Sequence, residues 1–285
     1  MTDVRTRKPR TPLSSTVLSR QRLSDSLVRI VLAGGELGRL ATGPINDYTD
    51  AYVKLLFLHP DADYDRPLDL DAIRASHPAE HWPRLRTYTV RDWNAERAEL
   101  TLDVVVHGDQ GLAGPWADRA EPGEDVLLLG PGGGYAPDPS ADWQLLIGDE
   151  SALPAIAVAA SRLPADSTAK IFIEVHGAAD EISLDVPPAA ELNWLHRGDN
   201  PVGVLLVSAV TGAEWPAGRV HAFVHGEAGA VKQLRRFLRV ERGIPAADLS
   251  ISGYWRLGAD DEAWRASKAE WNRQVEAEES AAGAV

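Results

Sequence analysis

The chain has 285 residues, which suits one large domain or two smaller ones, and its 44% hydrophobic and 25% charged residues are typical of globular proteins. It contains no cysteine, which excludes disulfides, cysteine-ligated iron–sulfur clusters and thiol redox centres, so electron transfer would need a bound organic cofactor. The formal net charge of −13 disfavours nucleic acid or an anionic membrane as a partner. An anionic ligand would therefore need a local basic pocket.

The chain lacks a run of about eighteen apolar residues, so we expect no membrane span. Residues 1–12 are basic and polar without the apolar stretch of a secretory signal, and we predict a disordered or loosely docked arm there. A cytoplasmic location is the default expectation, and we expect a monomer.

Short alternating segments separated by turn residues dominate the first half of the chain. A helical turn is expected over residues 36–40, and residues 61–84 are expected to form a loop with at most a short helix. The expected strands span residues 16–18, 27–32, 52–58, 86–92, 100–106 and 125–129. Such a succession predicts a six-stranded antiparallel β-barrel.

The pattern changes after the glycine-rich residues 130–134, because apolar strands of the buried type now alternate with helices. This alternation predicts a parallel sheet with right-handed crossovers, that is, a Rossmann-like α/β domain. Strands are expected over residues 143–147, 169–175, 202–207, 219–225 and 251–255, and helices over residues 150–163 and 228–242. The last segment, residues 260–279, predicts an amphipathic helix with Trp264 and Trp271 on one face.

The change of pattern also predicts the domain organisation. We expect a barrel domain over residues 13–138, an α/β domain over residues 139–258 and a helical tail over residues 259–285.

The strand at residues 86–92 carries two cations and an aromatic ring. We expect Arg86, Tyr88 and Arg91 to project from one face. Guanidinium groups bind phosphate and a tyrosine ring offers a stacking plane, so this face suits a flat, anionic ligand. A partly exposed strand with salt bridges is the alternative interpretation.

A second anion-binding device is predicted where the strand before Gly108 ends and a short helix begins near Gly111. A helix entered through glycine presents free backbone N–H groups, which attract a pyrophosphate. Two separated anion-binding devices with an aromatic ring between them predict a dinucleotide ligand such as FAD.

These two segments resemble the FAD-binding signature of the siderophore-interacting proteins, a family of ferric-siderophore reductases in the ferredoxin-reductase superfamily. The resemblance continues in the family's order through residues 52–57, 130–131, 148–156 and 253–256, and so covers most of the chain. It implies an FAD-binding barrel followed by an NAD(P)H-binding α/β domain. It also implies the reaction: hydride passes from the nicotinamide to FAD, and single electrons then pass to Fe(III) in a siderophore, which releases Fe(II).

By this resemblance, Tyr88 lies against the flavin ring, Thr89 hydrogen-bonds near its N5 and O4 edge, and His107 binds FAD without transferring a proton. A place in the core is the alternative for Trp116, and Leu112 replaces the proline that the family usually has. The residues implied to contact FAD are Arg86, Tyr88, Thr89, Asp103, Val105, His107, Gly108, Gly111, Ala113 and Trp116.

A nucleotide site is also predicted where a buried strand ends and a helix begins, as in doubly wound sheets. By resemblance, the residues facing the nicotinamide dinucleotide are Asp149, Glu150, Ser151 and Ala152. Asp149 or Ser151 is also a candidate helix cap. Glu174 and Asp180 are candidates for the adenosine ribose, where a carboxylate would favour NADH over NADPH.

The resemblance implies that Lys54 and Arg256 line a basic pocket for an anionic ferric siderophore. Many relatives carry another cation just after Gly-Pro, where this chain has Gly132. His77 and His81 have the spacing of metal ligands on a helix, but Pro78 between them argues against a metal site. Two other functions remain open, namely a flavin reductase or diaphorase with another acceptor, and a siderophore-binding protein without reductase activity.

Overall fold

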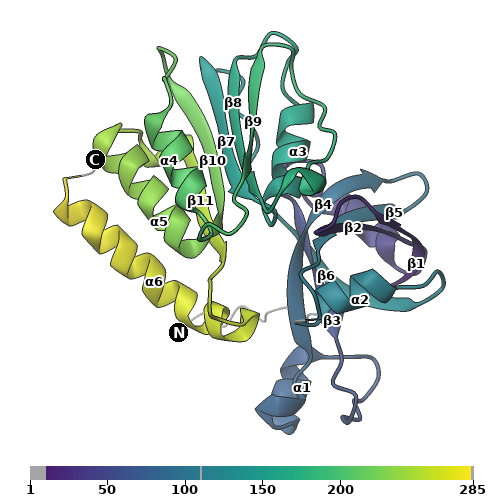
Figure 1. Ribbon diagram of the computed structural model, residues 1–285. Coiled ribbons are helices and arrows are strands. Elements are labelled where there is room, and N and C mark those ends of the chain that lie inside the picture. The colour runs from purple at the N-terminus through teal and green to yellow at the C-terminus, as the bar shows by residue number, and fades with distance from the viewer. Residues whose placement is uncertain (1–10, 110, 284–285) are drawn as a thin grey trace, which may run out of the picture.

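The computed structural model describes residues 11–109 and 111–283, so residues 1–10 of the predicted arm lie outside the described residues. The N-terminal half forms a closed β-barrel, and the C-terminal half forms an open parallel sheet with helices on both faces (Figure 1). The predicted fold class is confirmed. No described helix is long and apolar enough to cross a membrane.

The barrel closes in the strand order β1-β2-β5-β4-β3-β6. Its strands are β1 (Leu13–Arg22), β2 (Leu27–Ala33), β3 (Tyr52–Phe57), β4 (Arg84–Asn94), β5 (Glu99–Val105) and β6 (Asp125–Gly132). Alternation along each strand directs aliphatic side chains such as Val53, Leu55, Leu100 and Leu102 into the barrel, where each is at most 1% exposed. Full burial of each such side chain stabilises the fold by about 1.5–3 kcal/mol.

Short helices lie in three connections of the barrel: η1 (Leu37–Thr42) after β2, α1 (Leu70–Ser76) and η2 (Ala79–His81) between β3 and β4, and α2 (Ala113–Arg119) after β5. The β3–β4 connection projects from the barrel in Figure 1 and has its own small apolar cluster. Asp69 caps α1 by accepting a hydrogen bond from the Asp71 backbone N–H at 2.9 Å. A loop with at most a short helix was expected here, and the structure adds the short 3₁₀ turn η2 to α1.

The α/β domain has a five-stranded parallel sheet in the order β11-β10-β7-β8-β9. Its strands are β7 (Trp143–Asp149), β8 (Ala169–Val175), β9 (Ala190–His196), β10 (Val220–Glu227) and β11 (Leu249–Trp255). Helix α3 (Leu153–Ser161) covers one face, and α4 (Val204–Gly212) and α5 (Ala228–Arg236) cover the other. The remaining turns are η3 (Ala178–Asp180), the π-helical η4 (Phe237–Glu241) and η5 (Ala246–Asp248). Apolar cores on both faces explain why these strands lack alternation.

The prediction of a strand at residues 202–207 is wrong, because this segment enters α4. Gly203 precedes the helix with φ +83°, and the carboxylate of Glu174 accepts hydrogen bonds from the backbone N–H groups of Gly203 (2.7 Å) and Leu206 (3.1 Å). A remote side chain therefore caps this helix, and a short apolar run gives no local sign of that. The edge strand β9 was not predicted.

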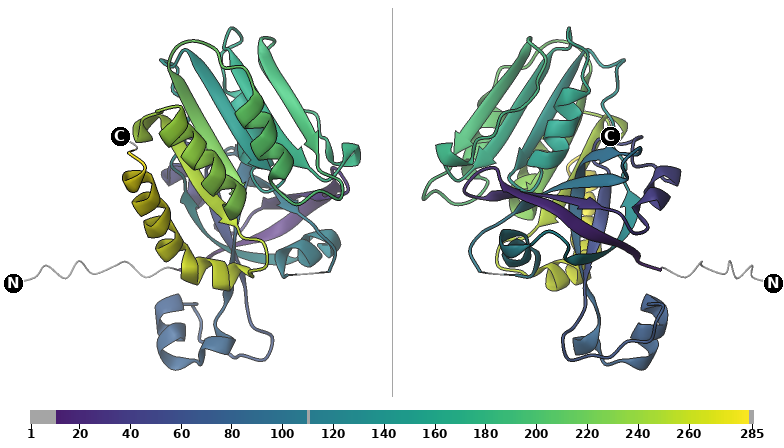
Figure 2. Two further views of the ribbon diagram at one scale, coloured as in Figure 1. Left: turned by 60° about the vertical axis from the view of Figure 1, so that its left-hand side comes forward. Right: turned by 90° about the vertical axis from the view of Figure 1, so that its right-hand side faces the viewer.

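The C-terminal helix α6 (Asp261–Ala281) contacts both halves of the molecule. Figure 2 shows it running beside α5, to which it is ion-paired through Lys232–Glu278 at 2.8 Å and through Arg235–Glu279. Its first turn reaches β4 of the barrel through Glu262. Trp264 and Trp271, predicted to lie on one face of this helix, are in contact, with ring centroids 5.5 Å apart.

Candidate flavin and nicotinamide sites

Strand β4 has one free edge at the end of the barrel. Residues 84–89 pair with β3, whereas the ladder between β4 and β5 covers only residues 90–94. Among the described strands, none pairs with the β5 side of residues 84–89. The backbone N–H and C=O groups of this edge can hydrogen-bond a planar polar ring, because such an edge is a ready template for pairing.

Tyr88 is half-buried and packs against the barrel core. Tyr88 pairs with Val53 of β3. Phe57, four residues after Val53, projects from the same face of β3. Phe57 contacts the Trp116 ring of α2 edge-on, with centroids 5.9 Å apart. Burial raises the pKa of Tyr88, so its hydroxyl stays protonated and can donate a hydrogen bond.

The turn before α2 has the geometry that the glycines were predicted to provide. Gly108 and Gly111 adopt φ +65° and +82°, and a Cβ at either position would meet no described atom within 4 Å. Their conformation, not crowding, requires glycine, and the space beside them is open. The turn therefore leaves room for a group to approach the backbone at the start of α2.

Arg86 is already ion-paired. Its guanidinium donates to both carboxylate oxygens of Glu262, at 2.6 and 3.0 Å, and lies 3.3 Å from Asp261. Its side chain is 14% exposed. The start of α6 therefore lies directly beside the predicted flavin-binding strand, and an anionic ligand at Arg86 would share this cation with two carboxylates.

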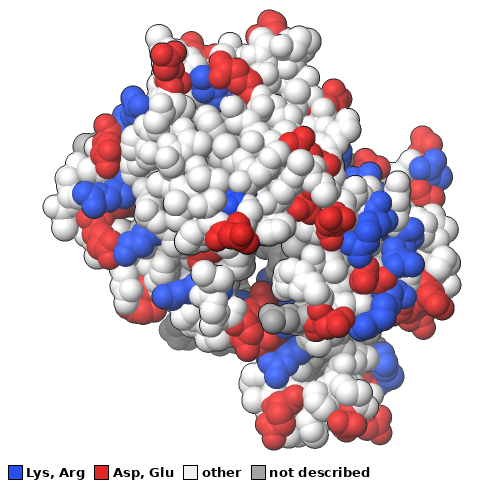
Figure 3. Space-filling view, viewed as in Figure 1, with Lys and Arg blue, Asp and Glu red and all other residues white. Residues whose placement is uncertain are grey.

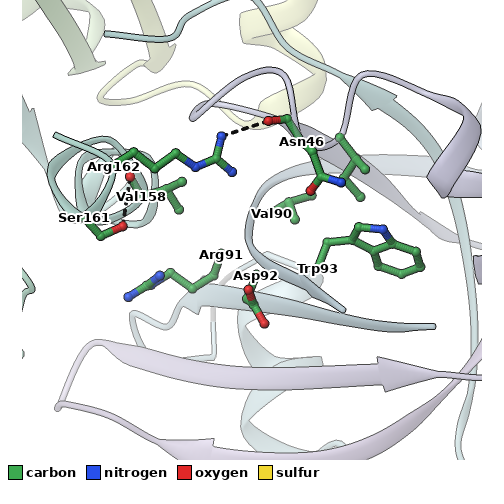
Figure 4. Close-up of a pocket in the computed structure, with 9 residues that line it drawn as sticks. Asn46, Val90, Arg91, Asp92, Trp93, Val158, Ser161 and Arg162 are labelled. Atoms are coloured by element: carbon green, nitrogen blue, oxygen red, sulfur yellow. Dashed lines mark hydrogen bonds between the residues drawn. The ribbon is translucent and has the colours of Figure 1, made fainter. Parts of the chain in front are cut away.

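Arg91 does not share the face of Tyr88, and this prediction is wrong. It lies three residues after Tyr88 and at a bulge in the ladder, so the pleat turns its side chain to the opposite side. Its Nε lies 3.7 Å from Asp103, which forms a bidentate ion pair with Arg29 at 2.7 and 2.8 Å. Figure 4 shows Arg91 lining a polar pocket between β4 and the end of α3, where Arg162 donates to the Asn46 carbonyl.

The other residues of the predicted flavin set have varied surroundings. Thr89 is buried opposite Tyr52, and Ala113 is buried at the first turn of α2. Val105 packs against the core of the α/β domain, whereas His107 is exposed at the end of β5. Trp116 is half-buried against the barrel core and donates to Glu124 at 2.8 Å.

Asp149 ends β7 and is 2% exposed. It accepts hydrogen bonds from the Ser151 and Glu227 backbone N–H groups and from Trp255 Nε1, at 2.9, 2.8 and 2.8 Å. Burial raises the pKa of Asp149, although these hydrogen bonds oppose the shift. The prediction that Asp149 or Ser151 caps the following helix is wrong, since Ala152 occupies the N-cap position of α3 without a side-chain hydrogen bond.

Glu150 and Arg197 form an ion pair at this edge, with a distance of 2.7 Å. Burial and the neighbouring Asp149 raise the pKa of Glu150, while Arg197 lowers it. Arg197 also lies 4.0 Å from Glu174, whose fully buried carboxylate caps α4 and has no surface for a ribose. Arg197 is a cation that the sequence analysis missed, because it follows the unpredicted strand β9.

Asp180 is also buried at this edge, with 3% exposure. One of its carboxylate oxygens accepts from the Gly177 backbone N–H at 3.2 Å, and the other has no hydrogen-bond partner among the described residues. Of the two carboxylates predicted for the ribose, Asp180 therefore keeps acceptor capacity.

The two predicted substrate residues differ in their exposure to solvent. Lys54 is half-buried, with its Nζ 5.7 Å from the centre of the Tyr52 ring, and Arg256 is exposed just after β11. His77 contacts the Asp63 carbonyl at 2.8 Å and the Tyr64 ring. Within residues 11–109 and 111–283 we find no cluster of three acidic or histidine side chains arranged to hold a metal ion.

Comparison with known proteins agrees with this geometry. Residues 16–135 match the family model of the siderophore-interacting FAD-binding domain, and residues 141–258 match that of the siderophore-interacting protein. The chain is 46% identical over 268 residues to an uncharacterized protein of Mycobacterium tuberculosis, covering 89% of this chain and 93% of that protein. It is 32% identical over 247 residues to the ferric vibriobactin reductase ViuB of Vibrio cholerae, covering 85% and 88%.

A solved structure shows the same relationship. The crystal structure of a siderophore utilization protein from T. fusca superposes with a TM-score of 0.74 at 36% identity, covering 87% of this chain and 94% of that chain.

Proposed function

Because the chain belongs to the siderophore-interacting protein family, we propose that it is an FAD-dependent ferric-siderophore reductase that takes electrons from NAD(P)H. The name of its relative in Vibrio cholerae, a ferric vibriobactin reductase, supports a reaction of this class. The absence of cysteine supports a flavin as the redox group, because the chain itself offers no thiol chemistry.

The observations that carry the proposal are the part of β4 that β5 leaves unpaired, residues 84–89, and the open, positive-φ turn at Gly108 and Gly111 that leads into α2. In this proposal the Tyr88 ring lies against the flavin, and the Thr89 hydroxyl and the free backbone edge hydrogen-bond its polar rim. The backbone N–H groups at the start of α2 and the Arg86 guanidinium bind the diphosphate. Asp103 and Val105 act indirectly: Asp103 holds Arg29 in an ion pair, and Val105 packs against the second domain.

Bound FAD would accept two electrons as a hydride and pass them on singly, which is the conversion needed between a nicotinamide and Fe(III). The role of the protein is to position the nicotinamide and the ferric chelate. We propose that residues 149–152, at the carboxyl end of β7, face the nicotinamide dinucleotide, with Arg197 beside them as an additional polar contact. Lys54 and Arg256 would attract the ferric chelate, whose iron stays coordinated by the siderophore until it is reduced.

An absorbance spectrum of the purified protein tests the first step, and anaerobic titration with NADH and with NADPH tests the second. Reduction of a ferric siderophore, followed with a chelator specific for Fe(II), tests the third. Arg86→Ala should weaken FAD binding about tenfold or more, because a charge-assisted contact to phosphate is lost. Tyr88→Phe should lower the rate of chelate reduction, because the ring remains but its hydroxyl is lost.

Arg97→Ala serves as the matched control, since Arg97 lies in the β4–β5 turn and its side chain is 66% exposed. It should bind FAD as the unaltered protein does. A colourless protein that binds ferric chelates would instead support a siderophore-binding protein. A yellow protein that reduces quinones or free flavin but no ferric siderophore would support a diaphorase.

A further inference from the structure

The segment between β11 and α6, residues 256–260, connects the sheet with the barrel side of the molecule. It leads from the end of β11 to the start of α6, which is ion-paired to β4 through Glu262 (Figure 1). The same view in space-filling form shows a hollow where the two halves meet, with acidic and basic side chains around its mouth (Figure 3). Arg256 is the first residue of this segment, and its side chain is exposed. The position of its guanidinium therefore depends on how the backbone beside it is held.

The chain is hydrogen-bonded on both sides of Arg256. Before it, the indole Nε1 of Trp255 donates to Oδ2 of Asp149 at 2.8 Å. After it, the backbone N–H of Leu257 donates to Oε1 of Glu227 at 3.1 Å. The Leu257 side chain is 65% exposed and so packs little against the fold. The hydrogen bond to Glu227, rather than side-chain packing, therefore holds the chain just after Arg256.

Glu227 divides its two carboxylate oxygens between two elements. While Oε1 accepts from the segment after β11, Oε2 accepts from the backbone N–H groups of Gly229 at 2.6 Å and Ala230 at 3.0 Å, which caps α5. The backbone N–H of Glu227 donates to Oδ2 of Asp149 at 2.8 Å. Because this oxygen also accepts from Trp255, it ties the end of β10 to the end of β11. Glu227 is 8% exposed, so its contacts are shielded from water.

The residue type at position 227 indicates that the second contact matters. Helix N-caps favour Ser, Thr, Asp and Asn, whose short side chains reach the N–H groups of the first turn. Glu227 occupies the N-cap of α5 although an aspartate would suffice for the cap alone. The additional methylene of glutamate lets Oε1 reach Leu257 while Oε2 stays on the helix. The length of this side chain thus serves the segment that carries Arg256.

We propose that Glu227 is a positioning residue for Arg256: its carboxylate fixes the backbone from which the Arg256 guanidinium contacts an anionic ferric chelate. The inference rests on the proposed function for the role of Arg256, and it adds to that site a residue that does not itself touch the ligand. A role confined to the cap of α5 is the alternative.

Glu227→Asp tests the proposal, because aspartate retains the cap but is too short to hold Leu257 as well. The probe is the trianionic gallium(III) tris-catecholate, since gallium(III) has the charge and nearly the size of Fe(III) but is not reduced. Its binding is followed by quenching of tryptophan fluorescence. Arg256→Ala should weaken this binding about 5–10-fold, and Glu227→Asp about threefold, because the guanidinium is displaced rather than removed. The double variant should bind as Arg256→Ala does, since Glu227 acts through the arginine.

Kinetic and stability measurements separate positioning from capping. Glu227→Asp should raise KM for the ferric tris-catecholate and leave kcat and the KM for the nicotinamide donor unchanged. Its unfolding temperature should stay within about 2 °C of the unaltered protein, because the cap of α5 remains. Glu278→Asp is the matched control, since Glu278 is a 59% exposed carboxylate on α6, and it should change none of these quantities.

Equal weakening by Glu227→Asp with and without Arg256, or no weakening at all, would overturn the inference. Gallium binding that depends on Glu227 only when Arg256 is present, without reduction of the iron form, would uphold the inference and contradict the reductase. Reduction of the ferric chelate that neither variant affects would support the reductase and overturn the inference.

Discussion

The free edge of β4 and the carboxyl edge of the parallel sheet both carry polar residues that motifs single out, but they differ in what those residues contact. At the barrel, β5 leaves residues 84–89 of β4 unpaired on one side, and the turn at Gly108 has open space beside it. At the sheet, Asp149 and Glu174 are buried and hydrogen-bonded to the chain's own backbone. Polar groups at the β4 edge are thus able to bind a ligand, whereas those at the carboxyl edge of the parallel sheet stabilise the fold.

The difference shows how to separate binding residues from structural ones. Removing a carboxylate that caps a remote helix lowers the stability of the fold, whereas replacing a glycine in an open turn mainly strains the local backbone conformation. The following three experiments test whether the two edges behave this way.

The largest effect is expected for Glu174→Ala. Removal of this carboxylate leaves the Gly203 and Leu206 backbone N–H groups without their acceptor in a buried site, so unfolding in urea should show a loss of about 3 kcal/mol. Glu191→Ala, an exposed carboxylate on β9, should cost less than about 0.5 kcal/mol. Similar losses for the two variants would mean that the sheet edge is not held by Glu174.

A smaller effect is expected from His225, which is 5% exposed at the end of β10 and stacks on Phe223. Burial lowers the pKa of His225 to about 3, below its ordinary value of 6.5. The unfolded chain therefore gains a proton that the folded chain does not, so stability is full above pH 6.5 and falls as the pH drops toward 3.

Lowering the pH from 7.5 to 5.0 should reduce the free energy of unfolding by about 2 kcal/mol through His225 alone. Titration of Asp and Glu is common to the unaltered protein and to a His225 variant, so it produces no difference between them. The measurement is the same urea titration at the two pH values for the unaltered protein and for His225→Gln. An equally steep loss in the variant would show that water reaches this histidine.

The smallest effect is expected for Gly108→Ala, which places a Cβ at φ +65° in open space. The strain should cost about 1 kcal/mol of stability, and Gly108→Asn should cost less because asparagine tolerates this region better. Gly38→Ala in η1 is the control, since its Cβ is also unobstructed but no positive φ is required. Stability equal to that control would mean that the turn before α2 does not need glycine.

Much of the fold follows from local patterns. Alternation predicted the barrel strands, and apolar runs predicted β7, β8 and β10, because burial on one or two faces leaves a direct mark on the sequence. Helix α4 could not be predicted, because its cap comes from Glu174 on another strand. Strand β9 escaped notice because its burial pattern is mixed at the edge of the sheet.

The candidate site was predicted at the level of segments but less well at the level of single side chains. The conformations of Gly108 and Gly111 agree with the expectation of a glycine turn before a short helix. Arg91 was misplaced because its odd spacing from Tyr88 already puts it on the opposite face of a strand, whereas Glu174 was misplaced because a remote helix cap is a tertiary feature. Arg197 was missed, since it follows the unpredicted strand β9 and reaches Glu150 from there.

Helix α6 is ion-paired to the barrel at its first turn and to α5 at its last. It therefore acts as a brace whose ends are arginine–carboxylate clamps. Any hinge-like opening of the two halves must stretch one of these clamps, and added salt should loosen both. The rate at which large reactants enter and leave would then rise with ionic strength, opposite to the trend expected for electrostatic capture of an anion.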